Sequence, residues 1–139
     1  MRVVFTGVRS LRTERLPAAE MQRRFHRDGY FHHNGNAWEQ DGVLTISFTP
    51  TIFLNQDLTG TTLREVQTHE QRHVDDFRRL AGRLQPALER ACRRPDPQWD
   101  SLWQWFLYDL CEASATFHRS VGDPMVEICR PPSGQRPTG

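Results

Sequence analysis

The stretch TTLREVQTHEQRHVDDF, residues 61–77, places two histidines four residues apart, with a glutamate directly after the first. In a helix, residues four apart lie about 40° from each other around the axis, so His69 and His73 would share one face. Glu70 would lie beside that face. The spacing therefore predicts that two imidazoles can reach one ion from a single rigid element.

Helix signals surround this motif. Thr62 and Glu65 have the spacing of a capping box, in which a hydroxyl and a carboxylate bind the free amides at a helix start. Apolar residues, including Val66 and Phe77, then recur at three- and four-residue steps up to Gly82. We expect a motif helix over this range, with its histidines on a partly apolar side.

Strand signals come before the motif. The run 42–55, GVLTISFTPTIFLN, is rich in β-branched and aromatic residues on either side of Pro50, which predicts a hairpin or a bent strand. Residues 3–8 predict a short strand. The segment 12–29 predicts a turn or short helix with Pro17 near its start.

Two helices are expected after the motif, a short one within residues 84–98 and a longer aromatic one from about Pro97 to Ser120. The pattern predicts an α+β fold in which a small antiparallel sheet packs on the motif helix and the long C-terminal helix. At 139 residues the chain fits one domain. We expect that domain to span residues 1–130 and a flexible tail to span 131–139.

The charge of the chain is nearly balanced, with 18 basic and 17 acidic residues and a formal charge of +1. No charge excess indicates nucleic acid or a membrane as a partner, and nothing indicates an oligomeric state. The first residues contain no apolar run long enough for a signal peptide or a membrane span. We therefore expect a cytoplasmic location, or export by a non-standard route.

The cysteines form no metal-binding pattern. Cys92, Cys111 and Cys129 are widely spaced and contain no Cys-x-x-Cys pair, so neither a zinc knuckle nor a disulfide framework is indicated. We expect three buried thiols.

Zinc is the cofactor that best fits the motif, and one ion is expected. Neutral imidazoles of His69 and His73 suit zinc at about 2.0–2.1 Å. Zinc lowers the pKa of a bound water to about 7, and the carboxylate of Glu70 would lie beside the ion, where it can take the proton of that water. This arrangement predicts a catalytic base at Glu70.

A catalytic zinc site usually has three protein ligands and one open position. Glu112 is the favoured third ligand, because a carboxylate in its aromatic neighbourhood is costly to bury unless a cation neutralises it. Asp109 and His118 are alternatives, and Asp76 is expected to orient an imidazole. Tyr108 and His118 are also candidates for catalytic hydrogen-bond donors to an oxyanion.

A second histidine pair, His32 and His33, is a weaker candidate for a metal site. Adjacent rings point apart in a strand, and the following Asn34-Gly35 suggests a turn.

With its motif helix, preceding strand and later Glu112, the range 43–120 resembles the zincin metallopeptidases of the gluzincin type. It is also loosely similar to small bacterial domains predicted to be zinc-dependent proteases. The resemblance implies a zinc metallopeptidase with Glu70 as general base, a peptide or protein substrate, and residues 46–53 lining the cleft. A gluzincin often has an acidic residue four positions after its third ligand, where this chain has Thr116. A metzincin ligand would fall at Arg79, which excludes that type.

Other functions fit the same residues. A zinc amidase or hydrolase could act on a small molecule or a cell-wall peptide. A binding or structural module would leave the histidines paired with Asp75, Asp76 or carbonyl groups, and Glu70 paired with Arg64 or Arg72.

Overall fold

The computed structural model describes residues 1–137, and its strands and helices confirm the α+β class. The chain divides into two compact units. One, here called the motif unit, contains residues 6–36 and 47–75. The other, here called the helical unit, contains residues 1–5, 37–46 and 76–137.

The motif unit contains a three-stranded sheet in the order β2-β6-β3. Its elements are β2 (Arg12–Leu16), α1 (Ala18–Phe25), β3 (Gly29–His32), β6 (Thr51–Asn55) and the first half of α2 (Gly60–Ala91). Strand β2 runs parallel to β6 and β3 antiparallel to it. Ile52 and Leu54 of β6 form a buried cluster with Val74 of α2, and the half-buried Leu63 and Val66 pack against it. This apolar face orients the first half of α2.

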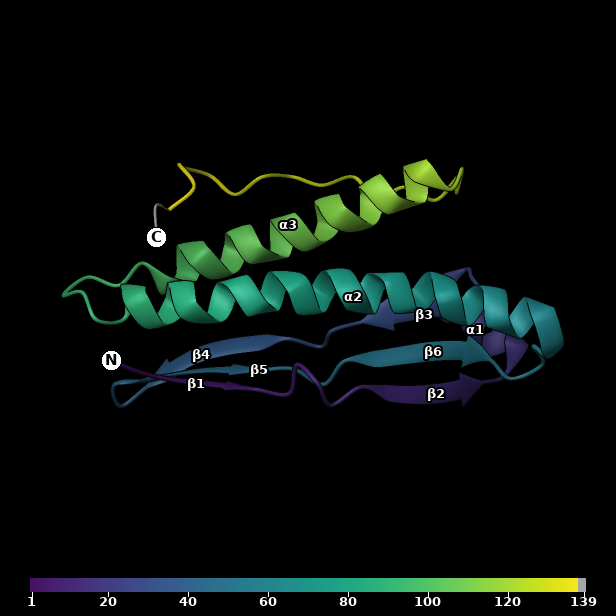
Figure 1. The fold of residues 1–139 in the computed structure, drawn as a ribbon, viewed down its shortest axis with the longest axis horizontal. Helices are drawn as coiled ribbons and strands as arrows, with labels where there is room; N and C mark the ends of the chain where they lie inside the picture. Colours follow the sequence, from purple (N-terminus) through teal and green to yellow (C-terminus); the bar gives the residue numbers. More distant parts are fainter. Residues whose placement is uncertain (138–139) are drawn as a thin grey trace. The chain divides into compact units, whose positions relative to one another are not determined.

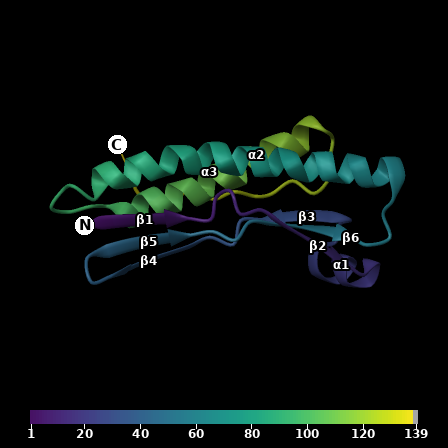
Figure 2. The ribbon, with the colours of Figure 1, turned by 60° about the horizontal axis from the view of Figure 1, so that its bottom comes forward.

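The helical unit contains the second sheet, in the order β1-β5-β4, with the second half of α2 and helix α3 (Trp99–Ser120). Its strands are β1 (Arg2–Thr6), β4 (Asn36–Gln40) and β5 (Val43–Ser47). Asp41 and Gly42, both with positive φ, join β4 to β5, as is usual for a two-residue hairpin turn. Helix α3 runs alongside the second half of α2, as Figures 1 and 2 both show. Buried residues of both helices, among them Phe77, Leu84, Leu88, Trp103 and Phe106, belong to its core.

The strands differ from the sequence prediction in their pairing. Instead of one antiparallel sheet, the chain forms two sheets, one of them mixed. The strands on either side of Pro50 exist, but β5 and β6 belong to different sheets and form no hairpin. Each lies in the middle of its sheet, so residues 46–53 offer no free strand edge to a substrate. Strands β2, β3 and β4 were not predicted, because their sequences, RTERL, GYFH and NAWEQ, lack a regular alternation of apolar and polar residues.

The helices agree better with the prediction, apart from the length of α2. This helix begins at Gly60 and continues through Gly82 and Pro86 to Ala91, so the separate short helix expected within residues 84–98 was wrong. A proline inside a helix removes one backbone hydrogen bond. Leu84 and Leu88, which are both buried, flank Pro86 and hold this turn against the core. The long aromatic helix ends at Ser120 as predicted.

The prediction of three thiols was wrong, because Cys111 and Cys129 form a disulfide. Only Cys92 is a free, buried cysteine. The disulfide joins α3 to the chain that follows it, and Arg136 further along forms two contacts of 2.7 and 2.9 Å with the Asp109 carboxylate. Of the tail expected at 131–139, residues 138–139 lie outside the described residues. Within residues 1–137, no helix is both long and apolar enough to cross a membrane.

Candidate metal centre

Helix α2 brings the two motif histidines together. Their Nε2 atoms lie 3.3 Å apart, and the rings are in an edge-to-face arrangement with centroids 5.0 Å apart. Two nitrogens that bind one tetrahedral zinc at about 2.05 Å would lie about 3.3–3.4 Å apart. The separation of His69 and His73 therefore fits two ligands of one ion. It also fits a hydrogen bond between a protonated and an unprotonated ring nitrogen.

Glu70 is buried on the same helix, with a relative exposure of 2%. Its Oε1 atom lies 4.0 Å from Nε2 of His69. The edge strand β3 packs closely on this side chain, since a Cβ atom added at Gly29 would lie 3.1 Å from Cγ of Glu70 and 2.4 Å from a methyl group of Val66. The carboxylate is thus held beside the histidine pair rather than exposed on the outer face of the helix.

The third donor close to the pair is His118 of α3. One ligand atom from each of His69, His73 and His118 lies within 4.8 Å of the others. In the described part of the chain, this is the one group of three or more His, Cys, Asp or Glu residues found close enough to bind a metal ion. Three histidines therefore lie close enough to hold a metal, and Glu112 is not among them.

Glu112 instead lies beside Tyr108, one turn earlier on α3. Burial raises the pKa of the Tyr108 phenol, and the nearby negative charge of the Glu112 carboxylate raises it further. The phenol thus stays protonated beside the carboxylate. Glu112 was predicted as a ligand because burying its carboxylate would be costly without a cation. Its side chain is only half-buried, so this cost is smaller than the sequence suggested.

The other predicted carboxylates have arginine partners. Asp109 binds Arg136, whose guanidinium also lies 4.4 Å from the Trp105 ring centroid. Asp76 lies 3.3 Å from the guanidinium of Arg79. Neither aspartate belongs to the three-histidine group.

His118 is buried and has carboxylates near both ring nitrogens. Oε1 of Glu127 lies 2.7 Å from Nδ1, and Oδ2 of Asp123 lies 4.0 Å from Nε2. Sequence reasoning missed Glu127, which follows the end of α3 in a segment without helix or strand. Gly122, in a helix-ending position, was a signal that the chain turns back there.

His32 and His33 lie outside the three-histidine group. Their rings stack at 5.0 Å, and Nδ1 of His33 accepts a hydrogen bond from the Gly35 amide. Burial, with a smaller contribution from His32, lowers the pKa of His33 to about 4. This ring therefore stays neutral at physiological pH and closes the turn after β3.

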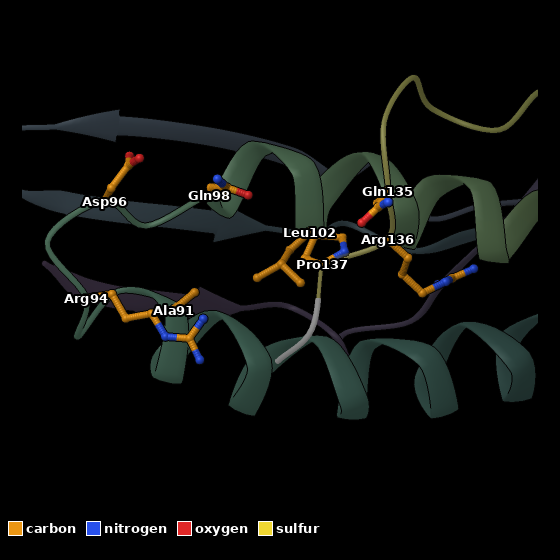
Figure 3. Close-up of a pocket in the computed structure, with 8 residues that line it drawn as sticks. All are labelled: Ala91, Arg94, Asp96, Gln98, Leu102, Gln135, Arg136 and Pro137. Atoms are coloured by element: carbon orange, nitrogen blue, oxygen red, sulfur yellow. The ribbon is translucent and has the colours of Figure 1, made fainter.

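A cavity of about 340 Å³ lies in the helical unit, between the end of α2, the start of α3 and the tail (Figure 3). Arg94, Asp96 and Gln98 contribute polar groups to its lining. None of the predicted site residues lines it. The cavity is therefore not part of the candidate metal centre.

Comparisons with family models, curated proteins and solved structures gave no match for this chain.

Proposed function

We propose that the chain is a zinc-dependent hydrolase of amide bonds, with His69, His73 and His118 as the three protein ligands and an extended peptide as the substrate. The observation that carries the proposal is the 3.3 Å separation of the two Nε2 atoms on α2, which matches the spacing of two zinc ligands. The nearness of His118 supports a third imidazole in place of Glu112.

Three imidazoles form a neutral ligand set, which leaves the double charge of the ion uncompensated. Three histidines and one open position are a known catalytic arrangement for zinc. A bound zinc ion would lower the pKa of its water to about 7 and polarise the scissile carbonyl. Hydrolysis then needs one further group, a carboxylate within reach of that water that can act as the general base.

Glu70 is that carboxylate. Its Oε1 atom lies 4.0 Å from Nε2 of His69, so it would be next to an ion held by that nitrogen without being one of its ligands. Glu70 accepts a proton from the attacking water and delivers it to the leaving amine. Tyr108 lies beside the Glu112 carboxylate, and we assign it no role in the reaction.

The substrate strand is proposed to pair with β3. This strand is at the edge of its sheet, and its first residue, Gly29, packs against Glu70. An exposed strand edge can bind an extended peptide through backbone hydrogen bonds. Peptide hydrolysis is therefore favoured over hydrolysis of a small amide.

The test is hydrolysis of an unbiased fluorogenic peptide library and a set of small amides by the zinc-loaded protein. Glu70→Gln should retain zinc and lose about 10²–10⁴-fold in turnover, because it removes the base but no ligand. Glu65→Gln, an exposed change on the same helix, is the matched control and should retain full turnover. Cleavage of small amides alone would favour the small-molecule hydrolase. A zinc-loaded protein that cleaves neither set would support a structural metal site.

A further inference from the structure

We propose that Glu127 is a positioning residue that holds the His118 imidazole by its Nδ1 atom, and that the Cys111–Cys129 disulfide keeps Glu127 in place. This inference rests on the proposed function for the role of His118 as a ligand. The geometry itself lies entirely within the helical unit: Oε1 of Glu127 is 2.7 Å from Nδ1 of His118.

The end of α3 explains how Glu127 returns to a residue nine positions earlier. Gly122 has a φ of 72°, a left-handed conformation that favours glycine. The amide of Gly122 donates to the Arg119 carbonyl and the amide of Asp123 donates to the His118 carbonyl. These two bonds are those of a Schellman motif, which ends a helix and reverses the chain.

The segment after this turn is fixed at two further points. The Asp123 side chain accepts a hydrogen bond from the Met125 amide, 2.8 Å away. Two residues after Glu127, Cys129 is linked covalently to Cys111, which lies seven residues before His118 on α3. Because the segment has no helix or strand of its own, the disulfide is the strongest restraint on the position of Glu127.

A carboxylate beside Nδ1 biases which nitrogen carries the proton. The neutral imidazole has one protonated and one unprotonated nitrogen, and the negative charge 2.7 Å from Nδ1 favours the proton there, although the contact is not aligned as a hydrogen bond. Nε2 is then unprotonated and able to bind a metal ion. Carboxylates that hold ligand histidines in this way typically increase metal affinity by about 10–100-fold.

The first measurement uses metal-free protein. In the wild type, ¹⁵N shifts of the His118 ring at pH 8 should show a protonated Nδ1 and an unprotonated Nε2. Glu127→Ala should give a mixture of the two neutral forms. Glu127→Gln, which retains an acceptor oxygen, should restore most of the wild-type form. An unchanged form in Glu127→Ala would overturn the proposal, whether or not the protein binds zinc.

The second measurement is zinc affinity, obtained by competition with a chelator, together with the visible spectrum of the cobalt-substituted protein. Glu127→Ala should bind zinc about 10–100-fold more weakly and change the cobalt bands. Glu14→Ala, at an exposed position of β2, is the control and should change neither. Wild-type affinity and spectrum in Glu127→Ala would overturn the positioning role. Absence of zinc binding in the wild type would instead refute the proposed function, and the ring shifts would still decide on Glu127.

The disulfide is tested by replacing both cysteines with serine. The double variant Cys111→Ser/Cys129→Ser should shift the ring form and the zinc affinity in the same direction as Glu127→Ala, by a smaller amount. A double variant with the wild-type ring form would show that the turn at Gly122 is enough to hold Glu127, and would overturn the role of the disulfide.

Discussion

Strand β3 packs so closely on α2 at Gly29, next to Glu70, that we expect no larger side chain to fit at this position. A Cβ atom at this residue would lie 2.4 Å from a methyl carbon of Val66 and 3.1 Å from Cγ of Glu70. Carbon atoms in contact are normally about 3.5–4.0 Å apart, so Gly29→Ala requires the helix or the strand to move by about 1 Å. Overpacking of this kind costs about 1–3 kcal/mol.

The assay is urea unfolding of Gly29→Ala, Val66→Ala and the double variant. Gly29→Ala should lower the free energy of unfolding by about 1–3 kcal/mol. The double variant should be more stable than the sum of the single changes predicts, because removing the Val66 methyl groups makes room for the new Cβ. Gly82→Ala is the control: its Cβ would meet nothing within 4 Å in the interior of α2, and it should stabilise by about 0.5–1 kcal/mol. A Gly29→Ala variant as stable as the wild type would refute the close packing of β3 on Glu70.

Two further predictions concern stability. Replacing both Cys111 and Cys129 by serine should lower the free energy of unfolding by about 3 kcal/mol, since the disulfide closes a loop with a sequence separation of 18. Urea unfolding measures this change, and an unchanged unfolding midpoint would contradict the prediction. His33 has a folded pKa of about 4 against 6.5 for the unfolded chain, so the unfolded state binds the proton first as the pH falls. Its contribution to stability should therefore decrease between pH 6.5 and 4, by up to about 3 kcal/mol. His33→Asn should lose stability less steeply than the wild type in that range, and parallel pH profiles would contradict this.

The features that the sequence predicts well are those with strong local periodicity. His69, Glu70 and His73 lie on one helix, and a four-residue spacing determines their relative position without any knowledge of the rest of the fold. Helix α3 has an apolar stripe long enough to predict its last residue correctly. Val43 and Ile52 lie in β-branched runs, and both belong to strands.

The features that the sequence does not predict depend on long-range pairing. The cost of burying Glu112 was inferred from its aromatic neighbours in sequence, but its side chain is only half-buried, beside Tyr108 one helical turn away. The pairing of Cys111 with Cys129 depends on the turn at Gly122, and no spacing rule identifies such a pair. The parallel pairing of β2 with β6 likewise brings together segments far apart in the chain.

The central claim is that His69, His73 and His118 bind one zinc ion, and X-ray absorption at the zinc edge tests it most directly. Protein reconstituted with one equivalent of zinc should show three imidazole nitrogens and one further light atom at about 2.0–2.1 Å. His118→Ala should show two imidazoles, whereas Glu112→Ala should retain three. A spectrum with two imidazoles in the wild type, or loss of the ion in Glu112→Ala but not in His118→Ala, would contradict the account.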